Sequence, residues 1–394
     1  MSKITFYNFH LFDGKDNKII DNAWFTVDNK TGKIVNRGEG TSPGSDRRVD
    51  LKGKYVTPGL IDVHCHIALN PKAKTKFNIS ETEAAINAYQ NLKTLLKSGV
   101  TFIRSCGNSY DVDLKLNPLV KEGKLDNIPG IHPSGKCFSM TGGHGDAPHH
   151  AYLVDSKDEM RKGVRTALKN GAKIIKMMAT GGVVTPQDNM FDPQLSTEEM
   201  HTGIIEAHHK GVKVAAHAEG NPGIQNALDA GVDSIEHGFY TTKKQAQQMV
   251  KQKTYLTPTL SAEWVIAKYG PGILPGWEIK KDKDALDDTY KNFKVAYKTG
   301  VKFTLGTDSG TPFNPFNKTP FELELLTKIG MSSFEAFQCS SINSAKLCGI
   351  QKDHGTLEID KYADFLVLDS NPLGVIKAVQ QKDKQVYLHG KREF

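Results

Sequence analysis

From Gly59 onward the chain repeats one pattern of hydrophobic and polar positions. Each unit has a short apolar or β-branched run, then a polar loop rich in Gly, His or Asp, then an amphipathic segment. Short apolar runs bounded by turn residues predict buried strands, and amphipathic segments predict helices. The predicted strands cover residues 60–66, 100–106, 130–137, 172–178, 212–217, 233–237, 254–259 and 301–306.

Helical patterns lie between these strands. Examples are residues 81–97, 158–169, 197–209, 224–230 and 285–297. Several are followed by a glycine where helices commonly end, as in Ser98-Gly99. Strands and helices that alternate over about 290 residues predict the α/β class and a (β/α)8 TIM barrel. A doubly wound open sheet is the alternative, but the glycine-rich phosphate turn after its first strand is absent.

The two ends of the chain have a different pattern. Residues 1–56 and 355–394 alternate with a period of two and carry turn signals such as Asp13-Gly14 and His389-Gly390. We expect them to pair into one small β-sandwich domain beside a catalytic barrel of residues 57–354. Two separate hairpins are the alternative, although isolated hairpins are only marginally stable.

Composition excludes several classes of protein. A chain of 394 residues with 38% hydrophobic residues can bury a core without disulfides. The net charge of +7 is not gathered into a basic stripe with stacking aromatics, so nucleic-acid binding is not expected. Five cysteines without a C-x-x-C pair argue against a zinc ribbon. The chain has no signal-peptide core and no run of about 18 apolar residues, so we expect a cytoplasmic protein without membrane contact.

The first predicted strand ends in Asp62-Val63-His64-Cys65-His66. A period of two places Asp62, His64 and His66 on one face and Cys65 on the other, where it would pack against the outer helices. Two imidazoles thus meet at the carboxyl end of a barrel strand, where barrel enzymes place their active sites. The pair alone is weak evidence in a chain with 14 histidines, so its weight depends on the other strand ends.

Other predicted strands end in side chains of the same kind. Lys176 lies inside an apolar run, where an amine is costly unless it is paired or neutralised. His217, His237 and Asp308 follow three further strands. If the barrel forms, all of them point into one pocket with the first histidine pair. Histidines with a carboxylate are ligands that zinc and related divalent ions select.

Six stretches of sequence carry a family signature. They are TPGLIDVHCH (57–66), KIIKMMATGG (173–182), VAAHAE (214–219), SIEHG (234–238), LGTDS (305–309) and the closing GTL with ADFLVLD (355–369). Together they resemble the amidohydrolase superfamily, in its imidazolonepropionase-like and prolidase-like branch of metal-dependent amide hydrolases. The resemblance spans nearly the whole chain, and the combination is specific although no single stretch is.

The resemblance implies a binuclear metal site. It assigns His64, His66 and Asp308 to the more buried ion, and His217 and His237 to the second. Zinc is the expected metal, with cobalt or manganese as alternatives.

The resemblance also gives Lys176 and Asp308 special roles. Lys176 would be carboxylated by carbon dioxide and bridge the two ions, which turns a costly buried amine into an anionic oxygen ligand. Asp308 would take a proton during attack on the amide and return it to the leaving amine.

Three residues are candidates for substrate binding. In the resembled enzymes, a histidine in a Gly-Gly-His-Gly segment and a tyrosine three residues after the sixth-strand histidine hold the substrate carboxylate. These positions are His144 and Tyr240 here. Arg104 is a further candidate cation, but much of the family has an aspartate after it where this chain has Ser105.

The sequence therefore predicts a hydrolase for a small molecule, either a dipeptide or an N-acyl amino acid with a free carboxylate. Long loops at residues 181–196, 261–282 and 309–320 are expected to shape its pocket. A cyclic-amide hydrolase or deaminase with one metal is an alternative, against which Lys176 argues. A barrel that only binds is another. The sequence leaves homo-oligomerisation open.

Overall fold

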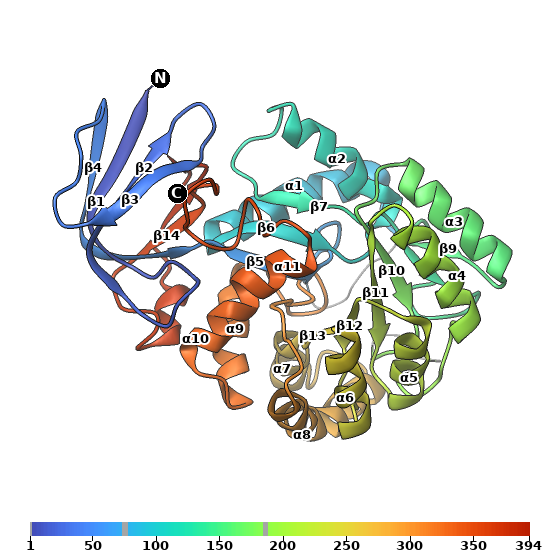
Figure 1. Cartoon of the computed structure of the whole chain (residues 1–394). Helices are drawn as coiled ribbons and strands as arrows, with labels where there is room; N and C mark the ends of the chain where they lie inside the picture. Colours follow the sequence, from blue (N-terminus) through green and yellow to red (C-terminus); the bar gives the residue numbers. More distant parts are fainter. Residues whose placement is uncertain (1, 73–77, 184–187) are drawn as a thin grey trace.

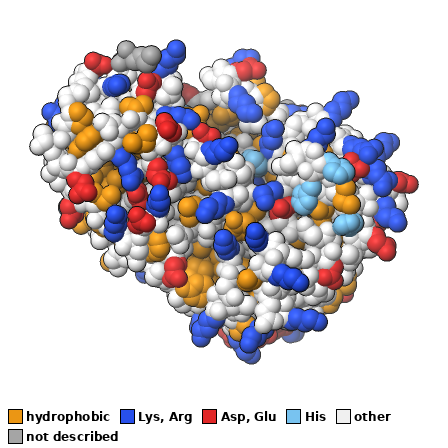
Figure 2. Space-filling view, viewed as in Figure 1, with side chains coloured by type: hydrophobic (Ala, Val, Ile, Leu, Met, Phe, Trp, Pro, Cys, Tyr) orange, Lys and Arg blue, Asp and Glu red, His pale blue; other side chains and the backbone are white. Residues whose placement is uncertain are grey.

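The structure is a computed structural model that describes residues 2–72, 78–183 and 188–394 (Figure 1). Part of the predicted loop at 181–196 therefore lies outside the described residues. The molecule has a TIM-barrel-type α/β fold with an additional sheet at one side, where both chain termini lie (Figure 1). On the face shown in Figure 2, basic and acidic side chains are interspersed.

Parallel strands make the inner wall of the barrel. They form two hydrogen-bonded sheets, ordered β5-β6-β7 and β13-β12-β11-β10-β8-β9. Their bounds are β5 (Leu60–Cys65), β6 (Val100–Ser105), β7 (Gly130–His132), β8 (Cys137–Ser139), β9 (Ala151–Leu153), β10 (Ile174–Met178), β11 (Lys213–Ala218), β12 (Ser234–His237) and β13 (Tyr255–Thr257).

Two predicted strands differ from the structure. The third is broken into β7 and β8, because Pro133 has no N–H to donate and Gly135 takes a left-handed φ of 70°. The eighth is an extended segment: Phe303 makes an isolated bridge to Leu256, and Leu305 accepts a bond from the Val63 N–H at 2.8 Å. This segment joins the two sheets between β13 and β5, so the barrel is not one continuous ladder.

Helices cover the outside of these strands. Their bounds are α1 (Glu81–Ser98), α2 (Val112–Lys121), α3 (Lys157–Lys169), α4 (Thr197–His208), α5 (Asn221–Ala230), α6 (Lys243–Gln252), α7 (Leu260–Tyr269), α8 (Gly276–Thr299), α9 (Thr319–Lys328), α10 (Ser333–Gln338) and α11 (Ser344–Leu347). Local signals explain their ends: the Ser80 hydroxyl accepts the Glu83 N–H at the start of α1, and Gly99 closes it with φ 107°.

The predicted loop at 261–282 is wrong, because α7 and the start of α8 occupy it. Helix α7 lacks the polar face that a period of 3.6 would reveal. Ser261 and Glu263 are as buried there as Val265 and Ile266, so the sequence shows no amphipathic pattern.

The two ends of the chain pair through β4 and β14, but into one sheet and not the predicted β-sandwich. Its order is β16-β15-β14-β4-β1-β2-β3. The strands are β1 (Lys3–Leu11), β2 (Ile20–Asp28), β3 (Ile34–Glu39), β4 (Arg47–Pro58), β14 (Phe365–Leu368), β15 (Gln385–Leu388) and β16 (Lys391–Arg392). Phe25 on β2 and Phe365 on β14 have ring centroids 5.1 Å apart although two strands separate them. The sheet therefore curls around its own core.

Candidate metal centre

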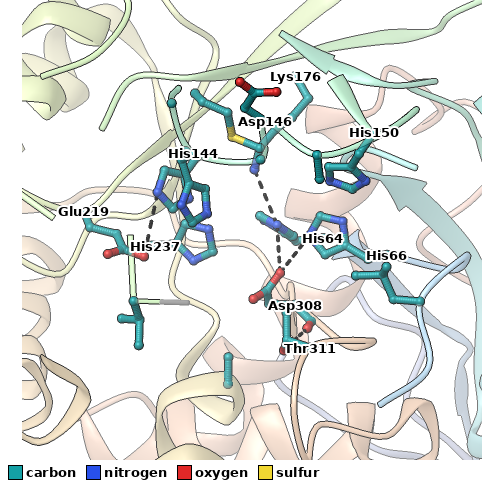
Figure 3. Close-up of a pocket in the computed structure, with 18 of the residues that line it drawn as sticks. His64, His66, His144, Asp146, His150, Lys176, Glu219, His237, Asp308 and Thr311 are labelled. Atoms are coloured by element: carbon teal, nitrogen blue, oxygen red, sulfur yellow. Dashed lines mark hydrogen bonds and ion pairs between the residues drawn. The ribbon is translucent and has the colours of Figure 1, made fainter. Parts of the chain in front are cut away.

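A cavity of about 280 Å³ opens at the carboxyl ends of the barrel strands (Figure 3). All six side chains predicted to form a metal site line it: His64, His66, Lys176, His217, His237 and Asp308. Other polar residues in its wall are His144, Asp146, His150, Glu219, Glu263 and Thr311. The fold thus gathers residues that lie up to 244 positions apart in the chain, from 64 to 308.

His64, His66 and Asp308 form the first group of ligand atoms. The Asp308 Oδ1 lies 3.2 Å from His64 Nε2 and 2.9 Å from His66 Nε2. Asp308 has a left-handed φ of 56°, which is costly for a residue with a side chain. Its neighbour Thr307 donates its hydroxyl to buried Asp62 at 2.7 Å, which helps to hold this turn in place.

Hydrogen bonds behind the rings orient the first two histidines. His66 donates Nδ1–H to the Gly107 carbonyl at 2.8 Å, and His64 Nδ1 lies 2.8 Å from a carboxylate oxygen of Glu236. Because Nδ1 is engaged behind each ring, Nε2 is the atom that faces the cavity and Asp308. Such outer partners are typical of histidines that bind metals.

His217, Glu219 and His237 form the second group, with one atom of each within 4.8 Å of the others. His217 donates Nε2–H to the Gly181 carbonyl at 3.1 Å, and His237 Nδ1 lies 2.8 Å from the Thr259 hydroxyl. Burial lowers the pKa of His217 and of His237 well below the ordinary value. Both rings are therefore neutral, which is the form that binds a metal.

Lys176 on β10 is only 1% exposed. Its Nζ lies 3.5 Å from His64 Nε2, and in the described part of the chain no carboxylate oxygen lies within 4.0 Å of it. A buried ammonium group without an anion is costly.

The residues present suit divalent ions. Both groups offer buried imidazole nitrogens, and Asp308 adds a carboxylate to the first; these are ligands preferred by zinc and its neighbours. Burial, together with Lys176, lowers the pKa of His64. Burial alone would raise the pKa of Asp308, but hydrogen bonds with His64 and His66 hold it well below its usual value. The carboxylate is therefore ionised and able to bind a cation.

The prediction that Arg104 binds substrate is not supported by its position. Arg104 is 2% exposed and does not line the cavity. It donates to the Val63 carbonyl at 2.6 Å, to Ser234 Oγ at 3.0 Å and to Glu236 Oε1 at 2.7 Å. Glu236 in turn contacts His64, so Arg104 holds the carboxylate that lies behind this ring. Sequence alone could not tell whether the Arg104 side chain is buried against other protein groups or faces the cavity.

Of the two other predicted substrate residues, His144 lines the cavity and Tyr240 does not. His144 stacks on His217 with ring centroids 4.3 Å apart, and its Nδ1 lies 3.0 Å from Asp188 Oδ2. Tyr240 packs on Phe191 at 4.5 Å and is not part of the cavity wall. Burial raises the pKa of Tyr240, and nearby acidic groups add to the shift.

Sequence reasoning missed two acids in the wall, Glu219 and Glu263. Glu219 lies two residues after His217, so the strand period already places it on the same face. Glu263 comes from α7, whose helical structure the sequence pattern did not reveal. No comparable local signal could have found it.

A barrel that gathers histidines, a buried lysine and an aspartate at its strand ends defines the class of barrel hydrolases that use divalent metals. The chain belongs to the Amidohydrolase family, which matches residues 55–392. The predicted resemblance is confirmed, and the protein is a hydrolase of carbon–nitrogen bonds. Within the described ranges, no helix is both long and apolar enough to cross a membrane.

Individual relatives agree with this assignment. The chain is 32% identical to ochratoxinase from Aspergillus niger over 359 residues, which cover 83% of this chain and 72% of that protein. It is 24% identical to an imidazolonepropionase from Fusobacterium nucleatum, over 96% of this chain and 93% of the other. The crystal structure of a Xaa-Pro dipeptidase with methionine in its active site matches with a TM-score of 0.90 and 30% identity, covering 99% of both chains.

Proposed function

We propose that this protein hydrolyses the amide bond of a dipeptide or N-acyl amino acid with a free carboxylate, at a binuclear centre bridged by carboxylated Lys176. The observation that carries this proposal is the buried Lys176 amine, which lines the same cavity as both ligand groups and has no carboxylate partner in the described chain. A site for one metal has no need of such a lysine.

Divalent ions in this cavity would supply Lewis acidity to a substrate carbonyl oxygen and to the attacking water. The chain supplies the proton transfer. Asp308 is ionised and lines the cavity, so it can accept a proton from the water during attack and return it to the leaving amine. The fixed rings of His64 and His66 keep its carboxylate in place.

The free carboxylate of the substrate is assigned to His144 and Tyr240. The contact with Asp188 fixes the His144 ring, and in its imidazolium form that ring donates to a substrate carboxylate as well. The Tyr240 hydroxyl would be the second donor.

Two measurements on one preparation test the proposal. Dipeptides and N-acyl amino acids are screened with zinc-, cobalt- and manganese-loaded protein, and bound metal is counted by elemental analysis. We expect turnover with two ions per chain. Lys176→Ala should lose metal and activity, and acetate or propionate should partly restore both. The control is Lys173→Ala, which removes an exposed lysine just before β10. Full activity with one ion per chain would favour the cyclic-amide or deaminase alternative.

A further inference from the structure

Two acids in the cavity wall each have one carboxylate oxygen without a hydrogen-bond donor among the described residues, although Glu219 Oε1 lies 3.8 Å from His217 Nε2 and Glu263 contacts Asp282. Glu219 and Glu263 are each 4% exposed. In the described chain, no N–H or O–H group donates to Glu219 Oε2 or to Glu263 Oε2. Asp282, fully buried, also has two oxygens without a donor, and it interacts with Glu263. A buried carboxylate is costly unless a cation or strong donor accompanies it.

The acids lie together on one side of the cavity. Figure 3 shows Glu219 beside His144 and His237, across from His66. Glu263 belongs to α7, and Ile266, almost one turn further along, lines the cavity with it. The nearby Lys281 donates to the carbonyls of Gly182, at 3.3 Å, and of Asp188. This wall therefore combines acidic groups with apolar surface, which suits an aliphatic chain that ends in a positive charge.

We propose that Glu219 and Glu263 form a cation subsite that binds an ammonium or guanidinium group of the substrate. This inference rests on the proposed amide hydrolysis and narrows its substrates to amides that carry a positive charge. Two sources supply that charge: the α-ammonium of an unblocked dipeptide, or a lysine or arginine side chain. Neutral N-acyl amino acids would then be poor substrates.

A set of four peptides separates the two sources. Alanyl-lysine, alanyl-norleucine and their N-acetyl forms share one scissile bond, and norleucine is lysine without its amine. We expect one of the two charges to raise kcat/KM by about 10- to 150-fold over the matching neutral peptide, the range for hydrogen bonds to charged groups. In Glu263→Gln the ratio of kcat/KM between charged and neutral peptide should fall to within about threefold. Glu278→Gln is the control, since Glu278 is a buried acid that does not line the cavity.

Calorimetry gives a readout that does not need turnover. Wild-type protein is titrated with L-lysine against L-norleucine, and with L-alanine against N-acetyl-L-alanine. This comparison stands even if Glu263→Gln fails to fold. If turnover and binding show no preference for either charge, the cation subsite is wrong, while the proposed amide hydrolysis still stands. Absence of turnover for all four peptides would overturn the amide hydrolysis of dipeptides instead. Loss of metal from Glu263→Gln with an unchanged ratio would show that the acids only balance the charge of the metals.

Discussion

The two sides of the cavity satisfy their buried charges in opposite ways. On the His64 side, comprising His64, Glu236 and Arg104, each charged group has a partner: Arg104 lies 2.7 Å from Glu236, which lies 2.8 Å from His64. On the Glu219 side, comprising Glu219, Glu263 and Asp282, carboxylate oxygens are buried without a donor from the described chain.

This difference indicates which parts of the site are complete in the protein alone. Arg104 and His64 hold the pKa of Glu236 far below its ordinary value, although burial opposes them. Burial raises the pKa of Asp282 to about 7, although a hydrogen bond with Glu263 and the charge of Lys283 oppose the shift. The side chains of the His64 side are held in place by the protein's own contacts before anything binds. On the Glu219 side, the buried carboxylate oxygens without a donor can gain one only from a molecule or ion that enters the cavity.

The largest expected effect concerns Asp308, on the His64 side of the cavity. Asp308→Asn keeps an oxygen for a metal but cannot accept a proton. We expect kcat to fall by about 10²- to 10⁴-fold, the usual range for one general acid or base, while bound metal falls little. Metal content and kcat are measured on the same preparation. If both fall in proportion, Asp308 acts only as a ligand and another group carries the proton.

Arg104 tests the pairing that distinguishes the His64 side. Arg104→Met leaves Glu236 buried without its main cation, and breaking such a pair typically costs about 3–5 kcal/mol. Urea unfolding of wild type and variant measures this loss.

The control for this variant is an exposed ion pair. Arg165 contacts Glu206 at 2.8 Å, but its side chain is 63% exposed. Arg165→Met should therefore cost no more than about 1 kcal/mol. Similar losses for the two variants would contradict the special role of the buried pair.

Much of the fold could be predicted because its signals are local. The predicted helix at 81–97 is α1, and the predicted helix at 197–209 is α4, each with a serine cap. Strand pairing between distant segments leaves no local signal. The pairing of β4 with β14 was predicted only as a general association of the two ends. The curled single sheet depends on contacts such as Phe25 with Phe365. The boundaries of the two predicted domains remain a prediction.

The candidate site likewise has features that local sequence predicts and features that it does not. Side chains at strand ends could be predicted to converge, since parallel strands end at one edge, and His64, His217 and Asp308 do line one cavity. Their roles as ligands remain predictions. The substrate role of Arg104 stays a prediction that its buried contact with Glu236 does not support, because strand parity does not say whether a long side chain turns toward a neighbouring carboxylate. Glu263 was missed because its helix has no polar face.

His144 tests whether the Glu219 side also binds an anion. If His144 holds the substrate carboxylate, free acids should exceed their amides in kcat/KM by about 10- to 150-fold, as expected for charge-assisted bonds. His144→Ala should remove this preference. His149→Ala is the control, because His149 is an exposed residue of the same loop that does not line the cavity. Equal turnover of acid and amide by the wild type would refute the assignment.

The last expected effect is a dependence of stability on pH. Burial is the main cause that raises the pKa of Asp282 from 3.8 to about 7. Between these values the folded protein keeps a proton that the unfolded chain releases, so the free energy of unfolding falls as pH rises. One such proton gives a slope of at most about 1.4 kcal/mol per pH unit. Asp282→Asn, which is neutral throughout, should become more stable relative to wild type between pH 4 and 7.

Urea unfolding at several pH values measures this difference, and the subtraction removes the groups that titrate in both proteins. Asp284→Asn is the matched control on the same helix, since the Asp284 side chain is 58% exposed and pairs with Lys280. If the free energy of unfolding of wild type and of Asp282→Asn changes with pH in parallel, folding does not raise the pKa of Asp282. A cationic ligand on the Glu219 side should also flatten the wild-type curve, because it favours the ionised carboxylate that the protein alone does not stabilise.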